Sequence, residues 1–435
     1  MTRMLTLIGL MFWAQPAGAD MFDLYGFQPR AAAMAGSHTA VADDFTAVFY
    51  NPAGLSLNRR VVTGAGYLVA SPALDVQLEN PVEGLSTPVE PPIMHGLTVG
   101  ALFPLGAALD DRIAIGFGIF LPSGYMARGE MLDPRTPQFY RYQNAPQKMS
   151  VLSGAAVEIT SWLHAGIALH MLSDITGEID LSLDLPNVQV RPGVVQVNVP
   201  AKASPIGGVL LIPLPGLRVG ASYRQAIQSD FRFPSRMTID GLLDLAFDVR
   251  GTVNYSPTTL SAGASYIVDA LNLLVSLDVN HQLWSRAPDP SLRLDVNFEG
   301  SLVEALGLDE RLDVLSTKPV DLGFRNTTRI NIGLEHQSTA NLTVRAGYGW
   351  RPSPAPIPTE TFNYIDSDAH LVAAGLGWTF YGGSKGTDVN VEIGYQGTML
   401  QEMPVTKRAQ AADPVGDYTA GGMVHSVSFA YRHAL

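Results

Sequence analysis

From Arg60 to the end of the chain, apolar residues recur at every second position in one segment after another. These segments are 61–69, 97–105, 113–121, 271–279, 330–334, 389–395 and 427–431. Polar or small residues fill the positions between, as Asn272, Ser276 and Asp278 do in the 271–279 segment. A period of two predicts β-strands with one apolar face.

The connections between these segments alternate between long and short. The long ones lie near 71–94, 122–146, 185–195, 229–248, 284–327, 351–368 and 399–423, and the short ones near 106–111, 159–162, 213–216, 268–271, 338–341 and 381–388. A soluble sandwich also alternates, but outer-membrane barrels combine short periplasmic turns with long external loops. We therefore predict an all-β fold, a transmembrane antiparallel β-barrel of about 14 strands in residues 58–435, with both chain ends on the periplasmic side.

Composition excludes several other classes of protein. The 435 residues carry a formal net charge of −12 and include no cysteine. Because no basic stripe is present to neutralise phosphates, a nucleic-acid partner is excluded. The lack of cysteine excludes disulfides and thiolate catalysis. Hydrophobic content is 46%, yet after the leader no apolar run reaches the roughly 18 residues of a membrane helix.

Residues 1–19 have the layout of a secretory leader. Arg3 precedes the apolar run Leu5–Ala14, and Ala17, Gly18 and Ala19 supply small residues for cleavage. The alternative is a buried N-terminal helix. We predict a signal peptide at 1–19, and hence export to the bacterial outer membrane.

Residues 20–57 alternate too weakly for a membrane strand and are too interrupted for one long helix. We predict that they form a hatch, or plug, folded inside the barrel. Asp43 and Asp44 favour either a helix N-terminal turn or polar contacts with barrel-lining cations. Asn51-Pro52-Ala53-Gly54 has the chemistry of a turn. The alternative is an ordinary loop leading into the first strand.

Two long connections have apolar residues at helical spacing, at 239–247 and 302–315. On an external loop such a stripe packs on neighbouring loops, meets lipid or binds an apolar ligand. Loop packing is the simpler explanation, and a ligand groove is the alternative. The candidate groove residues are Leu242, Leu243, Leu245, Phe247, Leu302 and Leu306.

Enzyme motifs lack their structural context. The G-x-S-x-G match at 382–386 lies between two predicted strands, whereas a nucleophile elbow needs a strand followed by a helix. His164 and His170 have the lumen-facing parity of one strand and fit polar barrel lining better than a metal site. No P-loop, H-E-x-x-H or dinucleotide motif is present. We therefore predict no enzyme activity, catalytic residue, metal or cofactor, although a membrane hydrolase with a Ser/His pair on facing strands stays an open alternative.

Residues 26–56 resemble the N-terminus of the FadL/TodX family of outer-membrane transport proteins for hydrophobic compounds. The most specific part is Ala42–Leu55, ADDFTAVFYNPAGL; Gly118–Gly124, GIFLPSG, is a second matching segment, and Arg141-Tyr142 is a third, weaker one. In motif the resemblance covers the N-terminal third of the chain, and in layout it continues to the last strand. The chain departs from the pattern at its end, where Leu435 replaces the aromatic residue common in such barrels.

The resemblance implies a monomeric barrel blocked by its N-terminal hatch. It implies passive uptake of long-chain fatty acids or aromatic hydrocarbons, caught in an outer groove and released laterally where the third strand kinks inward. The candidate residues for this lateral gap are Gly116, Gly118, Phe120, Pro122 and Gly124, because glycine weakens a strand and proline removes a ladder donor. The alternative is that the glycines only relieve crowding against the hatch.

These observations predict a transporter whose partners are an apolar small molecule and the lipid and lipopolysaccharide of the outer membrane. Two other functions stay open: a general porin or structural, adhesive barrel, and an outer-membrane lipid hydrolase.

Overall fold

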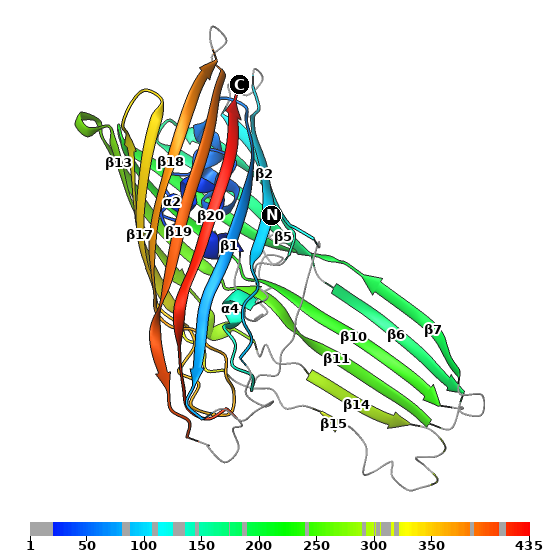
Figure 1. The fold of residues 1–435 in the computed structure, drawn as a ribbon. Helices are drawn as coiled ribbons and strands as arrows, with labels where there is room; N and C mark the ends of the chain where they lie inside the picture. The colour runs from blue at the N-terminus through cyan, green and yellow to red at the C-terminus, as the bar shows by residue number, and fades with distance from the viewer. Residues whose placement is uncertain are drawn as a thin grey trace, which may run out of the picture.

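The computed structural model describes residues 21–80, 88–106, 112–124, 135–143, 148–173, 175–184, 189–239, 243–288, 293–299, 301, 305, 315–316, 322–382, 387–408 and 415–435. Two sheets account for its strands, a closed barrel and a separate six-stranded sheet. Figure 1 shows the second sheet standing away from the barrel, on the side away from the C-terminus.

The barrel closes through antiparallel neighbours in the order β1-β2-β3-β4-β5-β8-β9-β12-β13-β16-β17-β18-β19-β20. These 14 strands confirm the predicted fold class. Their bounds are β1 Val62–Leu78, β2 Met94–Pro104, β3 Ile113–Pro122, β4 Ser150–Thr160, β5 Leu163–Ser173, β8 Ala201–Leu214, β9 Leu217–Arg224, β12 Thr259–Val268, β13 Leu273–Gln282, β16 Thr327–Gln337, β17 Leu342–Arg351, β18 Ala369–Gly382, β19 Thr387–Val405 and β20 Tyr418–Ala434. The first and last strands pair from Val62 with Ala434 to Leu78 with Tyr418, which closes the wall.

The side chains of the barrel strands follow the predicted period. Large apolar residues are exposed on the outside, for example Ile167, Leu277 and Ile332. Asp278 and Asn331 alternate with them and are buried inside. This arrangement gives the wall an apolar outer surface that suits lipid and a polar inner surface. In the described part of the chain, no helix combines the length and apolar character needed to cross a bilayer.

The second sheet corrects the predicted loops. It has the order β15-β14-β11-β10-β6-β7, with a parallel pair between β10 and β6. Its strands are β6 Ile175–Asp184, β7 Gln189–Asn198, β10 Ile227–Ile239, β11 Leu243–Ser256, β14 Arg293–Glu299 and β15 Leu315–Ser316. The connections expected at 185–195 and 229–248 are therefore largely strand. Parts of 71–94 and 399–423 are also strand, because β1, β19 and β20 extend further than predicted.

Residues 21–57, called the inner segment here, hold short helices packed against the inside of the barrel (Figure 1). They are α1 Met21–Tyr25, α2 Pro29–Ala33, α3 Ala47–Tyr50 and the 3-10 helix η1 Pro52–Leu57. Helix α2 lies against β17 to β20, whereas η1 lies against β3, β4, β5 and β8. The segment therefore touches opposite parts of the wall. Three further short helices are α4 Tyr140–Gln143, η2 Asp269–Leu271 and η3 Trp284–Arg286.

Candidate functional site: the inner segment in the barrel lumen

Acidic and basic side chains tie the inner segment to the wall. Asp43 lies 2.8 Å from Arg30 of the same segment and 3.3 Å from Arg218 of β9. Asp44 lies 2.6 Å from Arg432 of β20. Both aspartates therefore contact cations that line the barrel, which is one of the two roles predicted for this acidic pair. Asp44 also takes the other role, because its Oδ1 accepts a hydrogen bond from the Thr46 N–H directly before α3, at 2.8 Å.

The ion pairs continue around the wall. Arg30 is 2.7 Å from Glu335, which is 2.6 Å from Arg345. Arg345 then reaches Glu392 at 3.0 Å, and Glu392 lies 3.6 Å from Arg432. A continuous charged layer therefore links Asp43 to Asp44 through β16, β17, β19 and β20.

The charged layer keeps both aspartates ionised. Burial alone would raise the pKa of Asp43, but Arg30, Arg218 and Arg432 outweigh it and lower that pKa to about 2. Burial likewise opposes ionisation of Asp44, and the guanidinium of Arg432 lowers its pKa overall. Both aspartates are therefore ionised at neutral pH.

Asn51 fixes the end of the inner segment. Its Nδ2 donates to the carbonyls of Thr39 and Val209, both at 3.0 Å, and its Oδ1 accepts from the Ala53 N–H at 3.2 Å. Asn51 is fully buried, so each of these bonds replaces one to water. A Cβ on Gly208 would lie 2.0 Å from Asn51 Oδ1, which explains why glycine occupies that wall position.

The predicted turn residues pack against the wall in the same way. A Cβ on Gly166 of β5 would lie 2.4 Å from the Pro52 carbonyl carbon, and a Cβ on Gly54 would lie 2.0 Å from the Ala42 carbonyl oxygen. Ala53 is fully buried. The Asn51–Gly54 turn therefore fits only against small residues of the wall and of its own segment.

Asp278 of β13 holds the middle of the inner segment. Its Oδ2 accepts hydrogen bonds from the backbone N–H groups of His38 and Thr39, both at 2.8 Å. His38 is almost fully buried, and burial, reinforced by the charge of Arg30, lowers the pKa of its imidazole to about 4. His38 is therefore neutral at neutral pH.

The wall is unbroken where a lateral gap was predicted. β3 pairs with β2 from Ala114 to Pro122 and with β4 from Ile113 to Phe120. A Cβ on Gly116 would lie 2.5 Å from Leu55, and one on Gly118 would lie 2.5 Å from Phe27. The gap expected at these two glycines is absent, and both make room for the inner segment. Beyond Phe120 in the sequence, β3 is no longer hydrogen-bonded to β4, so Pro122 pairs only with β2. Gly124 follows with a positive φ.

The candidate groove residues divide into two groups. Leu243, Leu245 and Phe247 lie on β11, where they alternate with polar residues, so the predicted helical stripe is wrong there. The apolar residues in this segment also recur at every second position, and the segment forms a strand and not a helix. Leu242, Leu302 and Leu306 lie outside the described residues.

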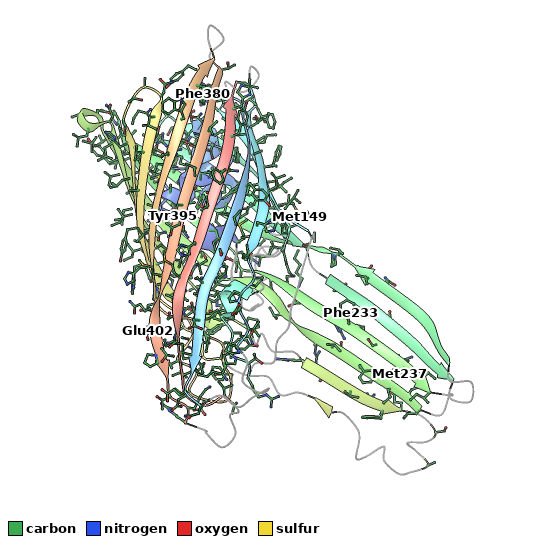
Figure 2. All side chains as sticks on the ribbon, viewed as in Figure 1. Met149, Phe233, Met237, Phe380, Tyr395 and Glu402 are labelled. Atoms are coloured by element: carbon green, nitrogen blue, oxygen red, sulfur yellow. The ribbon has the colours of Figure 1, made fainter. Side chains whose placement is uncertain are left out.

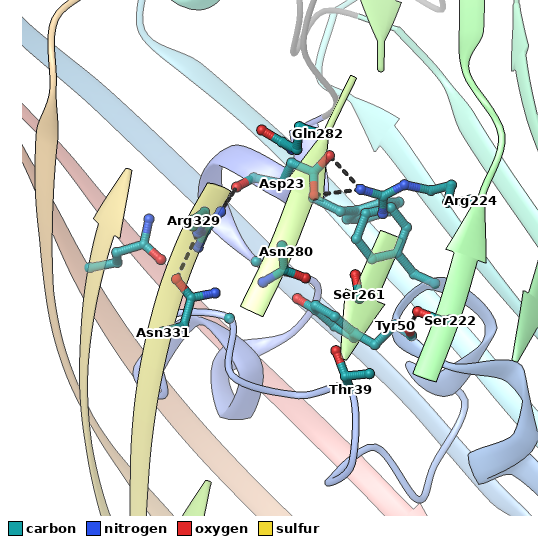
Figure 3. Close-up of a pocket in the computed structure, with 15 residues that line it drawn as sticks. Asp23, Thr39, Tyr50, Ser222, Arg224, Ser261, Asn280, Gln282, Arg329 and Asn331 are labelled. Atoms are coloured by element: carbon teal, nitrogen blue, oxygen red, sulfur yellow. Dashed lines mark hydrogen bonds and ion pairs between the residues drawn. The ribbon is translucent and has the colours of Figure 1, made fainter. Parts of the chain in front are cut away.

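A small polar cavity remains between the inner segment and the wall (Figure 3). At its edge Asp23 receives two hydrogen bonds from Arg224 of β9, at 2.6 and 2.7 Å, and Arg329 donates to the Asp23 carbonyl at 2.9 Å. The cavity volume is about 30 Å³. That is room for one or two water molecules and not for a hydrocarbon.

Aromatic rings fill the lumen beside this cavity. Phe22 lies 4.4 Å from Phe27, 5.1 Å from Phe49 and 6.3 Å from Phe120 of β3, measured between ring centroids. Phe120, one of the predicted gap residues, is fully buried. The inner segment and β3 thus form one apolar cluster.

A second aromatic group surrounds Arg141 of α4. Its guanidinium lies 4.7 Å from the centroid of Trp284 and 3.8 Å from Asp366. Asp366 also receives two hydrogen bonds from Arg351, at 2.7 and 3.0 Å. Within the described residues, Arg141 Nε and Nη1 have no hydrogen-bond partner although they are buried.

The lumenal histidines pair with serines. His164 Nδ1 lies 2.9 Å from Ser56 Oγ, and His170 Nε2 lies 2.6 Å from Ser150 Oγ. Among the described residues, no group of three or more His, Asp or Glu side chains is placed to hold a metal ion.

Sequence reasoning missed Asp278, Arg224 and Arg432 as partners of the inner segment. A signal was available, because all three have the inward parity of apolar strands. Such charges need partners in a lumen, but their partners lie more than 200 residues away.

The family model described as outer membrane protein transport protein (OMPP1/FadL/TodX) matches residues 208–433. The alkane uptake protein A of Marinobacter nauticus is 24% identical over 95% of this chain and 92% of its own length. Among solved structures, the toluene transporter TodX of P. putida matches with a TM-score of 0.58 and 15% identity over 95% of this chain and 99% of that chain. A FadL homologue of Pseudomonas aeruginosa matches with a TM-score of 0.57 and 14% identity over 98% and 99%.

Proposed function

Because this chain belongs to the OMPP1/FadL/TodX family, it transports hydrophobic compounds across the bacterial outer membrane, and we propose that its cargo is a long-chain alkane. The observation that carries this choice is the match to an alkane uptake protein, which spans nearly the full length of both chains. The aromatic cluster around Phe22 offers such a chain apolar contacts and places no demand for a polar group on it.

We propose that the inner segment is a hatch that must move for cargo to pass. The small polar cavity beside it leaves no space for a hydrocarbon. Displacement of the segment opens a path through the barrel. The concentration gradient of the cargo alone can then drive its movement along that path, so uptake is passive and needs no cofactor. The hatch also accounts for the small wall residues facing it at Gly116, Gly118 and Gly166.

We propose a lateral exit above the Phe120–Ser150 pair. Up to that pair β3 is bonded to β4, but Leu121 and Pro122 are paired only with β2. Phe120 belongs to the same apolar cluster as Phe22. A hydrocarbon that leaves there enters lipid and avoids the water-filled periplasmic mouth.

A long-chain fatty acid is the second candidate cargo, favoured by Arg141. Its buried guanidinium lies over the Trp284 ring and has N–H groups without hydrogen bonds to described residues. A carboxylate would satisfy them. Aromatic hydrocarbons, which the family resemblance implied alongside fatty acids, are the third candidate cargo. Their support is the similarity in fold to a toluene transporter.

Uptake by cells that lack their own transporters of this family separates the three. We expect this protein to increase the uptake of labelled hexadecane above that of palmitate and toluene. If palmitate is preferred and Arg141→Gln removes that preference, the cargo is the fatty acid. Equal, unstimulated uptake of all three compounds would refute the cargo proposal.

A disulfide lock tests the hatch separately from the cargo. A Cβ on Gly333 of β16 would lie 2.9 Å from the Cβ of Met34. That is shorter than the roughly 3.8 Å of a disulfide, so the inner segment must shift slightly away from β16 for the bond to form. The chain has no other cysteine. We expect the Met34→Cys/Gly333→Cys variant to lose uptake when oxidised and to regain it when reduced, while each single variant is insensitive to oxidation. Full uptake by the oxidised variant would show that the segment need not move.

Three further features belong to this proposal. Residues 1–19 act as a cleaved signal peptide, the mature barrel works as a monomer, and its outer surface contacts lipid and lipopolysaccharide. The exposed apolar residues on the wall support the contact with lipid. Mass spectrometry of the mature protein, with its N-terminus at Asp20, tests the cleavage.

A further inference from the structure

The second sheet has one apolar face and one polar face. The register places Met237 opposite Leu245, Phe247 opposite Val296 and Leu245 opposite Phe298, so these side chains share a face. Their sequence neighbours Thr238, Ala246, Asp248, Asp295 and Asn297 are on the other face. Figure 2 shows Phe233 and Met237 on this sheet, well away from the barrel wall.

The polar face is organised by ion pairs. Arg232 of β10 makes two hydrogen bonds to Asp248 of β11, both at 3.0 Å, and Arg250 lies 2.5 Å from Asp295 of β14. Half-exposed pairs of this kind suit a surface in water. On the apolar face, no ion pair joins the described residues of β10, β11 and β14.

Nothing in the described part of the chain forms a second layer over the apolar face. No described helix or other sheet packs across it, and Figure 1 shows the sheet as a single layer (β7 to β15). A soluble protein rarely leaves such an apolar surface uncovered, and here it spans β10, β11 and β14. The face therefore requires a partner.

The chain path identifies which side of the barrel wall continues into this face. Gln228 of β10 pairs with Tyr255 of β11, and the Tyr255 ring lies 6.1 Å from buried Trp284 at the barrel mouth. Gln228 also donates to Asp230, which begins the polar face. The polar face thus continues the lumen side, and the apolar face continues the outer side, where Tyr223 and Leu260 are exposed.

The direction of the sheet decides what this outer side meets. The sheet leans out from the barrel away from the end that carries the C-terminus (Figure 1). When a wall strand leans outward, its outer side turns toward the membrane and its lumen side toward the medium. An element with an apolar face below and ion pairs above matches a lipid–water boundary.

We propose that the apolar face of the β7-β6-β10-β11-β14-β15 sheet rests on the outer leaflet of the membrane beside the barrel, with lipid as its partner. The sheet enlarges the contact of the protein with that leaflet far beyond the circumference of the barrel. Hydrophobic compounds dissolved in the leaflet then meet the protein under the sheet as well as at the wall. This assignment holds whichever apolar cargo the barrel carries.

Site-specific fluorescence tests the proposal, since the chain has no native cysteine. Cysteines at Met237 and Leu245 report on the apolar face, and cysteines at the adjoining Thr238 and Ala246 are matched controls on the polar face. Each full-length variant carries one polarity-sensitive fluorophore and is placed in phosphatidylcholine vesicles that contain lipid with a nitroxide near the top of its acyl chain. Heat-modified migration in gels shows that each barrel is folded.

We expect loss of fluorescence by lipid quenching at positions 237 and 245 and none at 238 and 246. Equal quenching on both faces would overturn the proposal. So would apolar-face labels that are shielded from both water and lipid, because another part of the chain would then cover them. Quenching at positions 237 and 245 that appears only at a low ratio of protein to lipid would indicate that a second copy covers the face. Protection of these labels only by added hexadecane droplets would indicate an oil surface, and either result overturns the assignment to the leaflet.

Discussion

Asp44 and Arg432 lie 388 positions apart in sequence, yet their Oδ2 and Nη1 atoms are 2.6 Å apart inside the barrel. The contact joins the inner segment to the last strand of the barrel. Asp44 is buried and Arg432 is mostly buried, so loss of either partner leaves the other charge poorly solvated, at a cost in free energy. The pair is therefore a measurable part of what holds the inner segment in the closed barrel.

Removing one member of this pair should loosen the inner segment. We expect Asp44→Asn and Arg432→Gln each to weaken its docking by about 3 kcal/mol, because each leaves an uncompensated buried charge or polar group. Ion conductance through single barrels in planar bilayers measures the opening. As a control, Arg60→Gln removes the half-exposed pair with Asp388 and should leave conductance unchanged. Equal conductance in all three variants would contradict the role of the pair.

Gly118 provides a test of why β3 contains glycines. A Cβ there would lie 2.5 Å from the Phe27 ring, so Gly118→Val should push the inner segment away from the wall and increase its cleavage by protease. Phe27→Ala should reverse that effect by removing the ring.

Gly207 of β8 is the matched control for this experiment. A Cβ at Gly207 meets no atom within 4 Å, so Gly207→Ala should not change protease cleavage. If Gly118→Val increased uptake while protease cleavage stayed unchanged, the glycine would serve a wall opening and not the fit of the inner segment.

The sequence predicted the barrel because its strands obey a local rule. Inside and outside impose opposite polarity on successive residues, and that alternation is visible without knowing any partner, as in Leu277 and Asp278. The contacts of Asp43 and Asp44 with wall cations were predictable in kind for the same reason, since charges in a lumen need partners. Which cations they meet depends on the closure of the barrel, and local sequence carries no information on that.

The second sheet escaped prediction because length and spacing misled the interpretation. At most two residues separate β6, β7, β10 and β11 from the neighbouring barrel strands. Pro200 and Pro257 lie at two of these boundaries, but a single proline fits a bulge or kink within one long strand as well as the start of a second sheet. Leu243, Leu245 and Phe247 fit both a helical stripe and a strand over so short a window. The register that distinguishes the two is set by β10 and β14, which are distant contacts.

His38 predicts a response to mild acid. Its pKa is about 4 while buried, against about 6.5 when a displaced segment exposes it. Protons therefore favour the displaced state as pH falls from 6.5 to 4, and the docked state loses about 2 kcal/mol by pH 5. Asp43, with its pKa near 2, stays ionised and does not add to this effect. We expect single-barrel conductance to rise between pH 7.5 and pH 5.

The glutamine variant is the control for that response. His38→Gln keeps a polar side chain of similar size that cannot gain a proton, so its conductance should not change over this range. If this variant kept the full acid response, a group other than His38 would cause it. The charged groups that act on His38 are Asp43, Asp44, Arg30 and Glu335.

Asn51 separates docking of the inner segment from assembly of the barrel. Asn51→Ala removes two donated bonds and one accepted bond at a fully buried position, and it leaves the Val209 carbonyl short of a partner. The expected loss is about 2–4 kcal/mol of docking free energy. The strand ladder does not depend on this side chain, because Val209 remains paired with its neighbours on β5 and β9. Hydrogen exchange followed by mass spectrometry should therefore show faster exchange in residues 38–57 and unchanged exchange in β8. Faster exchange throughout the barrel would mean that the inner segment is needed for the wall itself, and it would then be a structural core and not a movable hatch.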